Sequence, residues 1–232
     1  MSNLPVLSPF EARVLGVLIE KEKTVPDSYP LSVNTLMLGC NQKTARDPVM
    51  AVTENEVQLA VDSLKNYALI IESSGGRVMR YAHNARRVFK LPEQSVALLA
   101  VLVLRGPQTA GELRINCDRL HPFADISSVD AFLEELAAAE TPWVVRLTKL
   151  PGSREHRWAH LLCGAVDEEA FKVAASSAPG SVDLGEAAAL KANVARLNDE
   201  VAALRAMVEK IQFELGLQKP VLMPGCPATR AG

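Results

Sequence analysis

The stretch CNQKTARDPV at 40–49 places a lysine and an arginine among amides and an Asp-Pro step. Lys43 and Arg46 have the chemistry to contact phosphate groups of a nucleic acid. Polar loop side chains often bond local backbone instead, so a second interpretation is a long turn in which a neighbouring carboxylate holds Arg46. In both interpretations Asn41, a residue that tolerates left-handed backbone, ends the preceding helix.

Further side chains suited to DNA follow in the next forty residues. Asparagine and glutamine can pair with adenine in the major groove, and cations on a hairpin can reach phosphate. The complete candidate set for nucleic-acid contact is Lys43, Arg46, Asn55, Gln58, Lys65, Arg77 and Arg80. Acidic residues oppose this hypothesis, since Glu54 and Asp62 share the outward face with Asn55 and Gln58.

Three helices and a hairpin are expected to position these residues. Ser8 and Glu11 form a capping-box pattern with Pro9 at the first helical position, which predicts a helix over about 9–23. Ser32 and Thr53 are expected to cap the second and third helices. The buried stripe of the first helix is predicted to be Phe10, Val14, Val17 and Leu18, and that of the third helix Val57, Ala60, Val61 and Leu64. LIIESSGGRVMRYAH then predicts a β-hairpin around Ser-Ser-Gly-Gly.

The same order recurs later in the chain. RVMRYAH at 77–83 matches REHRWAH at 154–160, and Cys40 and Cys117 are separated by the same offset of 77. The first helices match at an offset of 82 and the third helices at 72, as loop insertions between equivalent elements would produce.

The second copy is therefore predicted to contain a buried helix at 92–105, a Thr109/Glu112 capping box, a helix after Ser127 or Ser128 and a second hairpin. Its third helix is acidic, with Asp130, Glu134, Glu135 and Glu140 and no cation, so it is not expected to enter a DNA groove. Tyr81 and Trp158, at equivalent positions of the two copies, are interpreted as core aromatics. Three helices followed by a two-stranded wing indicate a tandem winged-helix protein, mainly α with small β-hairpins.

The segments YPLSVNTLMLGCNQKTARDPVM at 29–50, FEARVLGVLIEK at 10–21 and LRGPQTAGELR at 104–114 resemble the YceH-type family of uncharacterised bacterial proteins. The resemblance covers roughly residues 8–163. It implies a tandem winged-helix fold and a nucleic-acid role, and the family has no established activity that could be carried over to this chain.

Composition narrows the functional classes. The net charge is −2, with 48% hydrophobic and 22% charged residues, which argues against a strongly electrostatic DNA binder. No signal-peptide pattern or membrane-length apolar run occurs, which predicts a cytoplasmic protein without membrane contact. The four cysteines lack metal or disulfide spacing, and His156 and His160 are interpreted as structural. We therefore expect no enzyme, no metal and no cofactor.

The C-terminal third carries a heptad pattern. Its seam predicts a parallel homodimer through Leu190, Val194, Leu197, Val201, Leu204, Val208, Ile211 and Leu215. The expected domains are winged helices at 1–88 and 89–165, a linker at 166–183, a coiled-coil helix at 184–216 and a disordered tail at 217–232. Two functions fit this organisation: weak DNA binding or regulation through the first winged helix, or a protein-interaction scaffold.

Overall fold

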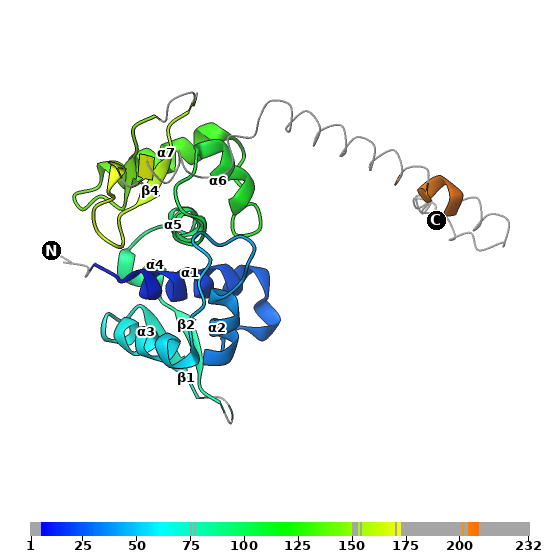
Figure 1. The fold of residues 1–232 in the computed structure, drawn as a ribbon, viewed down its shortest axis with the longest axis vertical. Helices are drawn as coiled ribbons and strands as arrows, with labels where there is room; N and C mark the ends of the chain where they lie inside the picture. Colours follow the sequence, from blue (N-terminus) through cyan, green and yellow to red (C-terminus); the bar gives the residue numbers. More distant parts are fainter. Residues whose placement is uncertain are drawn as a thin grey trace, which may run out of the picture. The chain divides into compact units, whose positions relative to one another are not determined.

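The computed structural model describes residues 6–74, 76, 78–149, 153, 155–169, 171–172, 201 and 204–208. The chain divides into two units, Met1–Ser176 and Ser177–Gly232. All the named helices and strands belong to the first unit (Figure 1). The predicted domain boundaries stay a prediction.

The first copy, here called module one, has three helices and a wing. Its elements are α1 (Pro9–Thr24), a short 3-10 turn η1 (Pro26–Ser28), α2 (Val33–Cys40), α3 (Glu54–Asn66), β1 (Ile70–Ser73) and β2 (Arg80–His83). The capping box of Ser8 and Glu11 is present, as are side-chain caps from Ser32 and Thr53. The strands are antiparallel, with Glu72 opposite Tyr81. The sequence prediction of this module is confirmed in order and in its caps.

The second copy, module two, repeats this order. Its elements are α5 (Glu93–Arg105), α6 (Ala110–Cys117), α7 (Ile126–Ala138), β3 (Val144–Arg146) and β4 (Trp158–His160). Thr109 and Glu112 form the predicted capping box of α6. The prediction that α7 starts after Ser127 or Ser128 is wrong, because Asp125 accepts from the backbone N–H of Ser128 and caps the helix two residues earlier.

The two modules make equivalent contacts at the offset that the repeat predicts. Both second helices end in a fully buried cysteine, Cys40 and Cys117. An isolated β-bridge joins Leu31 to Tyr81 in module one, and its counterpart in module two joins Gln108 to Trp158. The bridge partners are separated by 77 residues on both sides, so an internal sequence repeat corresponds here to a repeated tertiary contact.

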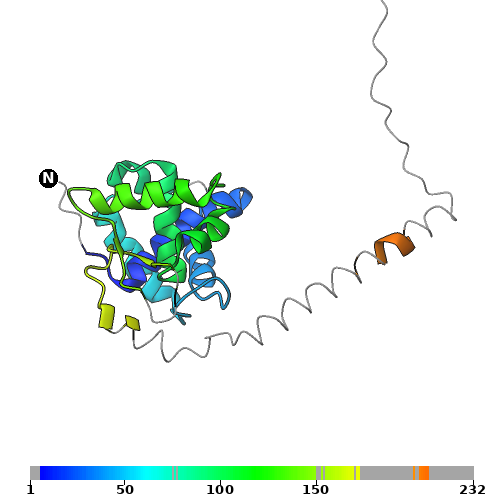
Figure 2. The same ribbon diagram turned by 90° about the horizontal axis from the view of Figure 1, so that it is seen from above.

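Helix α5 serves both modules. One face packs along α1, where Gly16 permits close approach, because a Cβ at this position would lie 3.0 Å from Val103 Cγ1. The opposite face contributes Leu98 and Leu102 to the core of module two. Because α5 is covered on two faces, it lacks the polar, solvent-facing side of an ordinary surface helix. This explains the continuous apolar run VALLAVLVL. Figure 1 shows α5 between the two modules, and the perpendicular view in Figure 2 shows their helices gathered into one body.

Two details of module one differ from the sequence prediction. Phe10 was expected in the buried stripe of α1 but is 45% exposed. In addition, a short helix that was not predicted, α4 (Ala85–Phe89), follows the first wing. Phe89 of α4 packs against Trp143 with ring centroids 4.8 Å apart, so this helix adds a second apolar contact between the modules.

Candidate functional site

The loop 41–52 between α2 and α3 is closed by its own first polar residue. The side-chain amide of Asn41 accepts from the backbone N–H of Val52 and donates to its carbonyl, both at 2.8 Å. Asn41 is the C-cap of α2, as predicted, and its φ of −86° shows that it ends the helix without left-handed backbone. The left-handed residue of the loop is Ala45, with φ 59°.

Arg46 lies inside the protein and not on its surface. Only 6% of the residue is exposed, and its guanidinium forms a bidentate pair with Glu20 of α1 at 2.6 and 3.1 Å. It also donates to the carbonyl of Gly39 and to the side chain of Gln42. Burial alone would raise the pKa of Glu20, but the hydrogen bonds and charge of Arg46 outweigh it and hold this pKa below its ordinary value. The assignment of Arg46 to phosphate is therefore corrected: it holds the loop, as the second interpretation proposed.

The same loop connects module one to module two. The backbone N–H of Asp47 donates to the carbonyl of Leu104 near the end of α5 at 2.8 Å. Arg13 of α1, 2% exposed, donates to the carbonyl of Pro48 at 2.8 Å. Most of the polarity of CNQKTARDPV is thus used in fixing the loop between α1, α3 and α5.

The remaining cations proposed for DNA contact differ in exposure and in whether they already have a partner. Lys43 is exposed and makes no hydrogen bond or ion pair within the described part of the chain. Arg80 is exposed but donates to the carbonyls of Ser28 and Pro30. Lys65 pairs with Glu72 of the wing at 2.6 Å and lies 3.9 Å from Asp62. Arg77 lies outside the described residues.

The amides on α3 are similarly divided. Asn55 is exposed at the start of the helix, whereas Gln58 donates to Asp62 at 3.1 Å. The outward face of α3 also exposes Leu59, at 62%. The helix that would read bases in a winged helix therefore combines one available amide with carboxylates and an apolar side chain.

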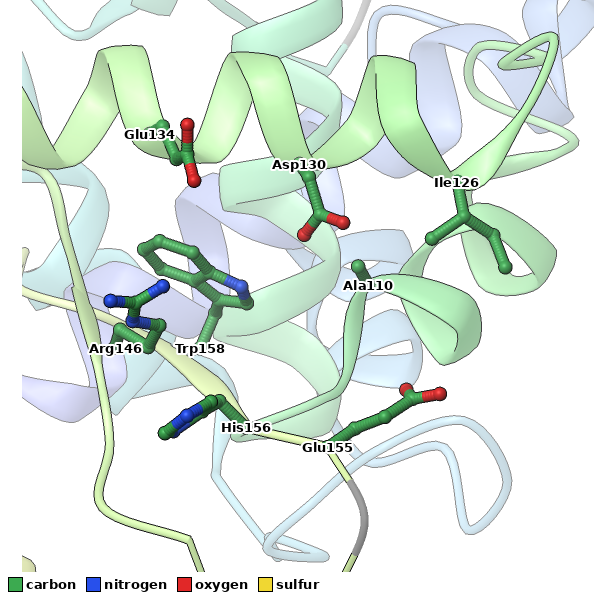
Figure 3. Close-up of a pocket in the computed structure, with 8 residues that line it drawn as sticks. All are labelled: Ala110, Ile126, Asp130, Glu134, Arg146, Glu155, His156 and Trp158. Atoms are coloured by element: carbon green, nitrogen blue, oxygen red, sulfur yellow. The ribbon is translucent and has the colours of Figure 1, made fainter.

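In module two, the space between α7, the start of α6 and the wing is an open cavity of about 370 Å³. We call it the module-two groove, and it is lined by Ala110, Ile126, Asp130, Glu134, Arg146, Glu155, His156 and Trp158. Figure 3 shows Asp130 and Glu134 descending from α7 toward Trp158, with His156 below on the wing. Arg146 lies over the indole ring of Trp158, with its guanidinium carbon 5.8 Å from the ring centroid.

The electrostatics of this groove are dominated by carboxylates. Burial, followed by the negative charges of Glu134 and Glu155, raises the pKa of Asp130, and Arg146 opposes this rise. No salt bridge within 4.0 Å engages Asp130, Glu134 or Glu155 in the described part of the chain. His156 bonds the carbonyl of Leu147 through Nδ1 at 3.0 Å.

The groove was missed by sequence reasoning, although its signal was present in the repeat. The strand registers place Glu72 opposite Tyr81 and Arg146 opposite Trp158, so Glu72 and Arg146 are equivalent. At the third-helix offset, Lys65 corresponds to Ala137. The wing charge is thus reversed in module two and the helix cation is lost, and aligning the two wings would have shown it.

The buried cysteines and histidines of the two modules lie in environments typical of structural residues. Burial raises the pKa of Cys40 to about 11 and that of Cys117 to about 12, so both thiols stay protonated near neutral pH. His83 lies 3.1 Å from Glu22, whereas Nδ1 of its counterpart His160 is buried without a hydrogen-bond partner. Among the described residues, no group of three or more histidine, cysteine or acidic side chains is arranged to hold a metal ion. No described helix combines the length and apolarity needed to cross a membrane.

Two copies of three helices followed by a two-stranded wing place this protein in the class of tandem winged-helix proteins. Residues 7–153 match DUF480, a family described as proteins of unknown function. UPF0502 proteins of Burkholderia multivorans and Burkholderia vietnamiensis are each 58% identical to the chain, over 211 and 214 residues, covering 91% of the chain and 90% of the relative. One of Burkholderia lata is 57% identical over 211 residues with the same coverage. The chain belongs to this uncharacterised bacterial family, which confirms the resemblance noted from its motifs.

Of the predicted dimer seam, only Val201, Leu204 and Val208 are described, and all three are exposed on helical backbone. The other seam residues, Leu190, Val194, Leu197, Ile211 and Leu215, lie outside the described residues. The predicted linker is described only in part and the predicted tail not at all.

Proposed function

We propose that this protein is a non-enzymatic interaction protein whose winged-helix modules bind a partner protein. The state of Arg46 carries this proposal: the central cation of the loop is 6% exposed and neutralised by Glu20. Without it, the outward faces of α3 and α7 are acidic, and carboxylates repel a phosphate backbone. Fold alone does not imply DNA binding, since the winged helix also serves as a rigid protein-binding block.

The proposal is tested by photo-crosslinking in a Burkholderia host. A photoreactive amino acid replaces Leu59, which is exposed on α3, and in a matched control it replaces Lys90, which is exposed between α4 and α5. We expect one discrete protein adduct from position 59 and none from position 90. The protein identified by mass spectrometry should then bind the purified full chain. Identical adduct patterns from both positions, or no complex with the purified protein, contradict the proposal.

Weak DNA binding through module one is a second candidate, because Lys43 is exposed without a partner among the described residues and Arg80 is exposed on wing strand β2. Each phosphate contact contributes about −0.9 to the slope of log affinity against log salt concentration. If both residues contact phosphate, Lys43→Ala with Arg80→Ala should flatten that slope by about 1.8. Titration of labelled duplex with the full chain at low salt decides this candidate. Absence of binding, or an unchanged slope in the double variant, removes it.

We further propose that the C-terminal helix pairs two chains. The exposure of Val201, Leu204 and Val208 supports this, because an apolar stripe at heptad spacing is buried when two helices associate. Val201→Asp with Leu204→Asp should yield monomers with intact winged helices, as measured by sedimentation and circular dichroism. A monomeric unmodified chain at micromolar concentration would contradict the pairing.

A further inference from the structure

We propose that the module-two groove binds a lysine-bearing segment of a partner protein. The lysine ammonium lies among Asp130, Glu134 and Glu155, and a carbonyl oxygen of the same segment accepts a hydrogen bond from the indole N–H of Trp158. This inference rests on the proposed protein-binding function and names the chemistry of the partner.

The first observation is uncompensated charge. In module one, the equivalent region neutralises itself, since Lys65 pairs with Glu72 at 2.6 Å and Gln58 donates to Asp62 at 3.1 Å. In module two, the lysine position is occupied by Ala137, and no cation within the described residues forms an ion pair with the three groove carboxylates. The raised pKa of Asp130 reflects burial and this repulsion. An ammonium group entering the groove would reduce the repulsion among these carboxylates.

The second observation is independent of the carboxylates. Trp158 is only 5% exposed, yet its indole N–H has no hydrogen-bond partner among the described residues. Figure 3 shows the indole nitrogen turned into the cavity, toward Asp130 and Ala110. The indole N–H thus opens onto the cavity (Figure 3), where a ligand can supply the acceptor that tryptophan N–H groups in protein interiors usually have. A ligand that supplies an acceptor beside a cation therefore fits better than a bare cation, and a peptide segment supplies both.

Shape and the position of Arg146 favour lysine over arginine. The cavity of about 370 Å³ is within the size range of small-ligand sites, roughly 300–1,000 Å³. Ile126, 48% exposed at its rim, offers an apolar surface for the aliphatic stem of a lysine. Arg146 already lies over the ring of Trp158, so the stacking position that a guanidinium would prefer is taken.

The experiment uses the full chain and an acetyl-Ala-Lys-Ala amide probe, with acetyl-Ala-Gln-Ala amide as the neutral control. The chain has two tryptophans, so a ¹⁵N–¹H spectrum gives two indole signals, which Trp143→Phe assigns. We expect the lysine peptide to shift the Trp158 signal saturably and to leave Trp143 in place. Asp130→Asn with Glu134→Gln should weaken binding at least tenfold. Glu135→Gln, which removes an exposed charge from α7 outside the groove, should leave it unchanged.

Three results would overturn the assignment: no saturable Trp158 shift, an equal shift with the glutamine peptide, or binding unaffected by the double variant. Tenfold tighter binding of a third probe, acetyl-Ala-Arg-Ala amide, would overturn the choice of lysine. Failure of these titrations together with a reproducible protein adduct at position 59 rejects the groove alone. Failure of the adduct experiment rejects the proposed function itself, whatever the peptide does.

Discussion

Modules one and two share an order of helices and a hairpin but differ in chemistry at two equivalent places. These are the region beneath the loop before the third helix and the region between the third helix and the wing. Beneath the loop that precedes the third helix, module one buries the ion pair of Arg46 and Glu20. At the position of Glu20, module two has the buried Leu102, and its shorter loop contributes Phe123 to the same apolar core. Between third helix and wing, module one pairs its charges, whereas module two leaves three carboxylates around a cavity.

The difference gives the two modules different polar contacts. The buried ion pair fixes a long loop that also contacts α5, so module one gains a defined inter-module contact. Module two has a short loop and an apolar core in that place, and its groove carboxylates form no ion pair within the described part of the chain. The repeated fold thus fixes the loop of one copy with a buried ion pair and leaves the groove carboxylates of the other copy without an ion pair among the described residues.

The largest expected effect concerns the buried ion pair. Arg46→Met leaves Glu20 without its guanidinium, so we expect a loss of about 3 kcal/mol of unfolding free energy, the scale of breaking one side of a buried pair. Glu20→Leu together with Arg46→Met, which imitates the apolar solution of module two, should recover most of it. Urea denaturation of the unmodified chain, the single variant and the double variant measures the three unfolding free energies. If Arg46→Met left the unfolding free energy unchanged, the ion pair would not be holding the loop.

The contact between the modules should be next in size. Gly16→Leu places a side chain where even a Cβ lies 3.0 Å from Val103, and overpacking of this kind costs between about 2 and 3 kcal/mol. Because α1 and α5 share this face, we expect one cooperative transition at lower temperature in calorimetry. Gly76→Leu, at a position with no neighbour within 4 Å, is the matched control. Two separate transitions in the unmodified chain would mean that the modules fold independently.

The equivalent histidines should respond differently to acid. Burial lowers the pKa of His160 from 6.5 to about 4, while in module one burial lowers the pKa of His83 against the opposing charge of Glu22. The unfolded chain binds a proton at His160 first, so stability falls as the pH drops from 6.5 toward 4. We expect this residue to contribute a loss of about 2 kcal/mol between pH 7 and pH 5.

His160→Gln should remove that part of the pH dependence, and urea denaturation at the two pH values measures it. His83→Gln is the matched substitution and should remove less, since Glu22 partly supports the charged form. An equal effect of both substitutions would contradict the assigned difference in surroundings.

The smallest effect concerns the carboxylates of the groove. Glu134→Gln removes a like charge near Asp130, so the pKa of Asp130 should fall toward its ordinary value, as followed by its side-chain carboxyl carbon in NMR. The equivalent Asp62→Asn in module one is expected to loosen Lys65 and Gln58 instead. An unchanged pKa of Asp130 would show that the charge of Glu134 does not contribute to the rise.

Much of the local structure was predictable because its signals are local. Ser8, Ser32, Thr53 and Thr109 each cap the helix predicted for them, since a hydroxyl one turn before an apolar run satisfies backbone donors whatever surrounds it. The repeat at 77 residues anticipated the equivalent β-bridges of Tyr81 and Trp158. Asp125 was missed as a cap because neighbouring serines compete for that role in the sequence.

The sequence by itself thus determined the order of the three helices and the wing in each module, four helix caps, the internal repeat and the family. Only the tertiary structure decided what the charged residues do. Whether Arg46 meets phosphate or Glu20 depends on two segments separated by 26 residues, and whether the α7 carboxylates are paired depends on a wing that follows them. Side-chain charge is a property of the residue, but its availability is set by distance and burial, which arise only when distant parts of the chain pack together.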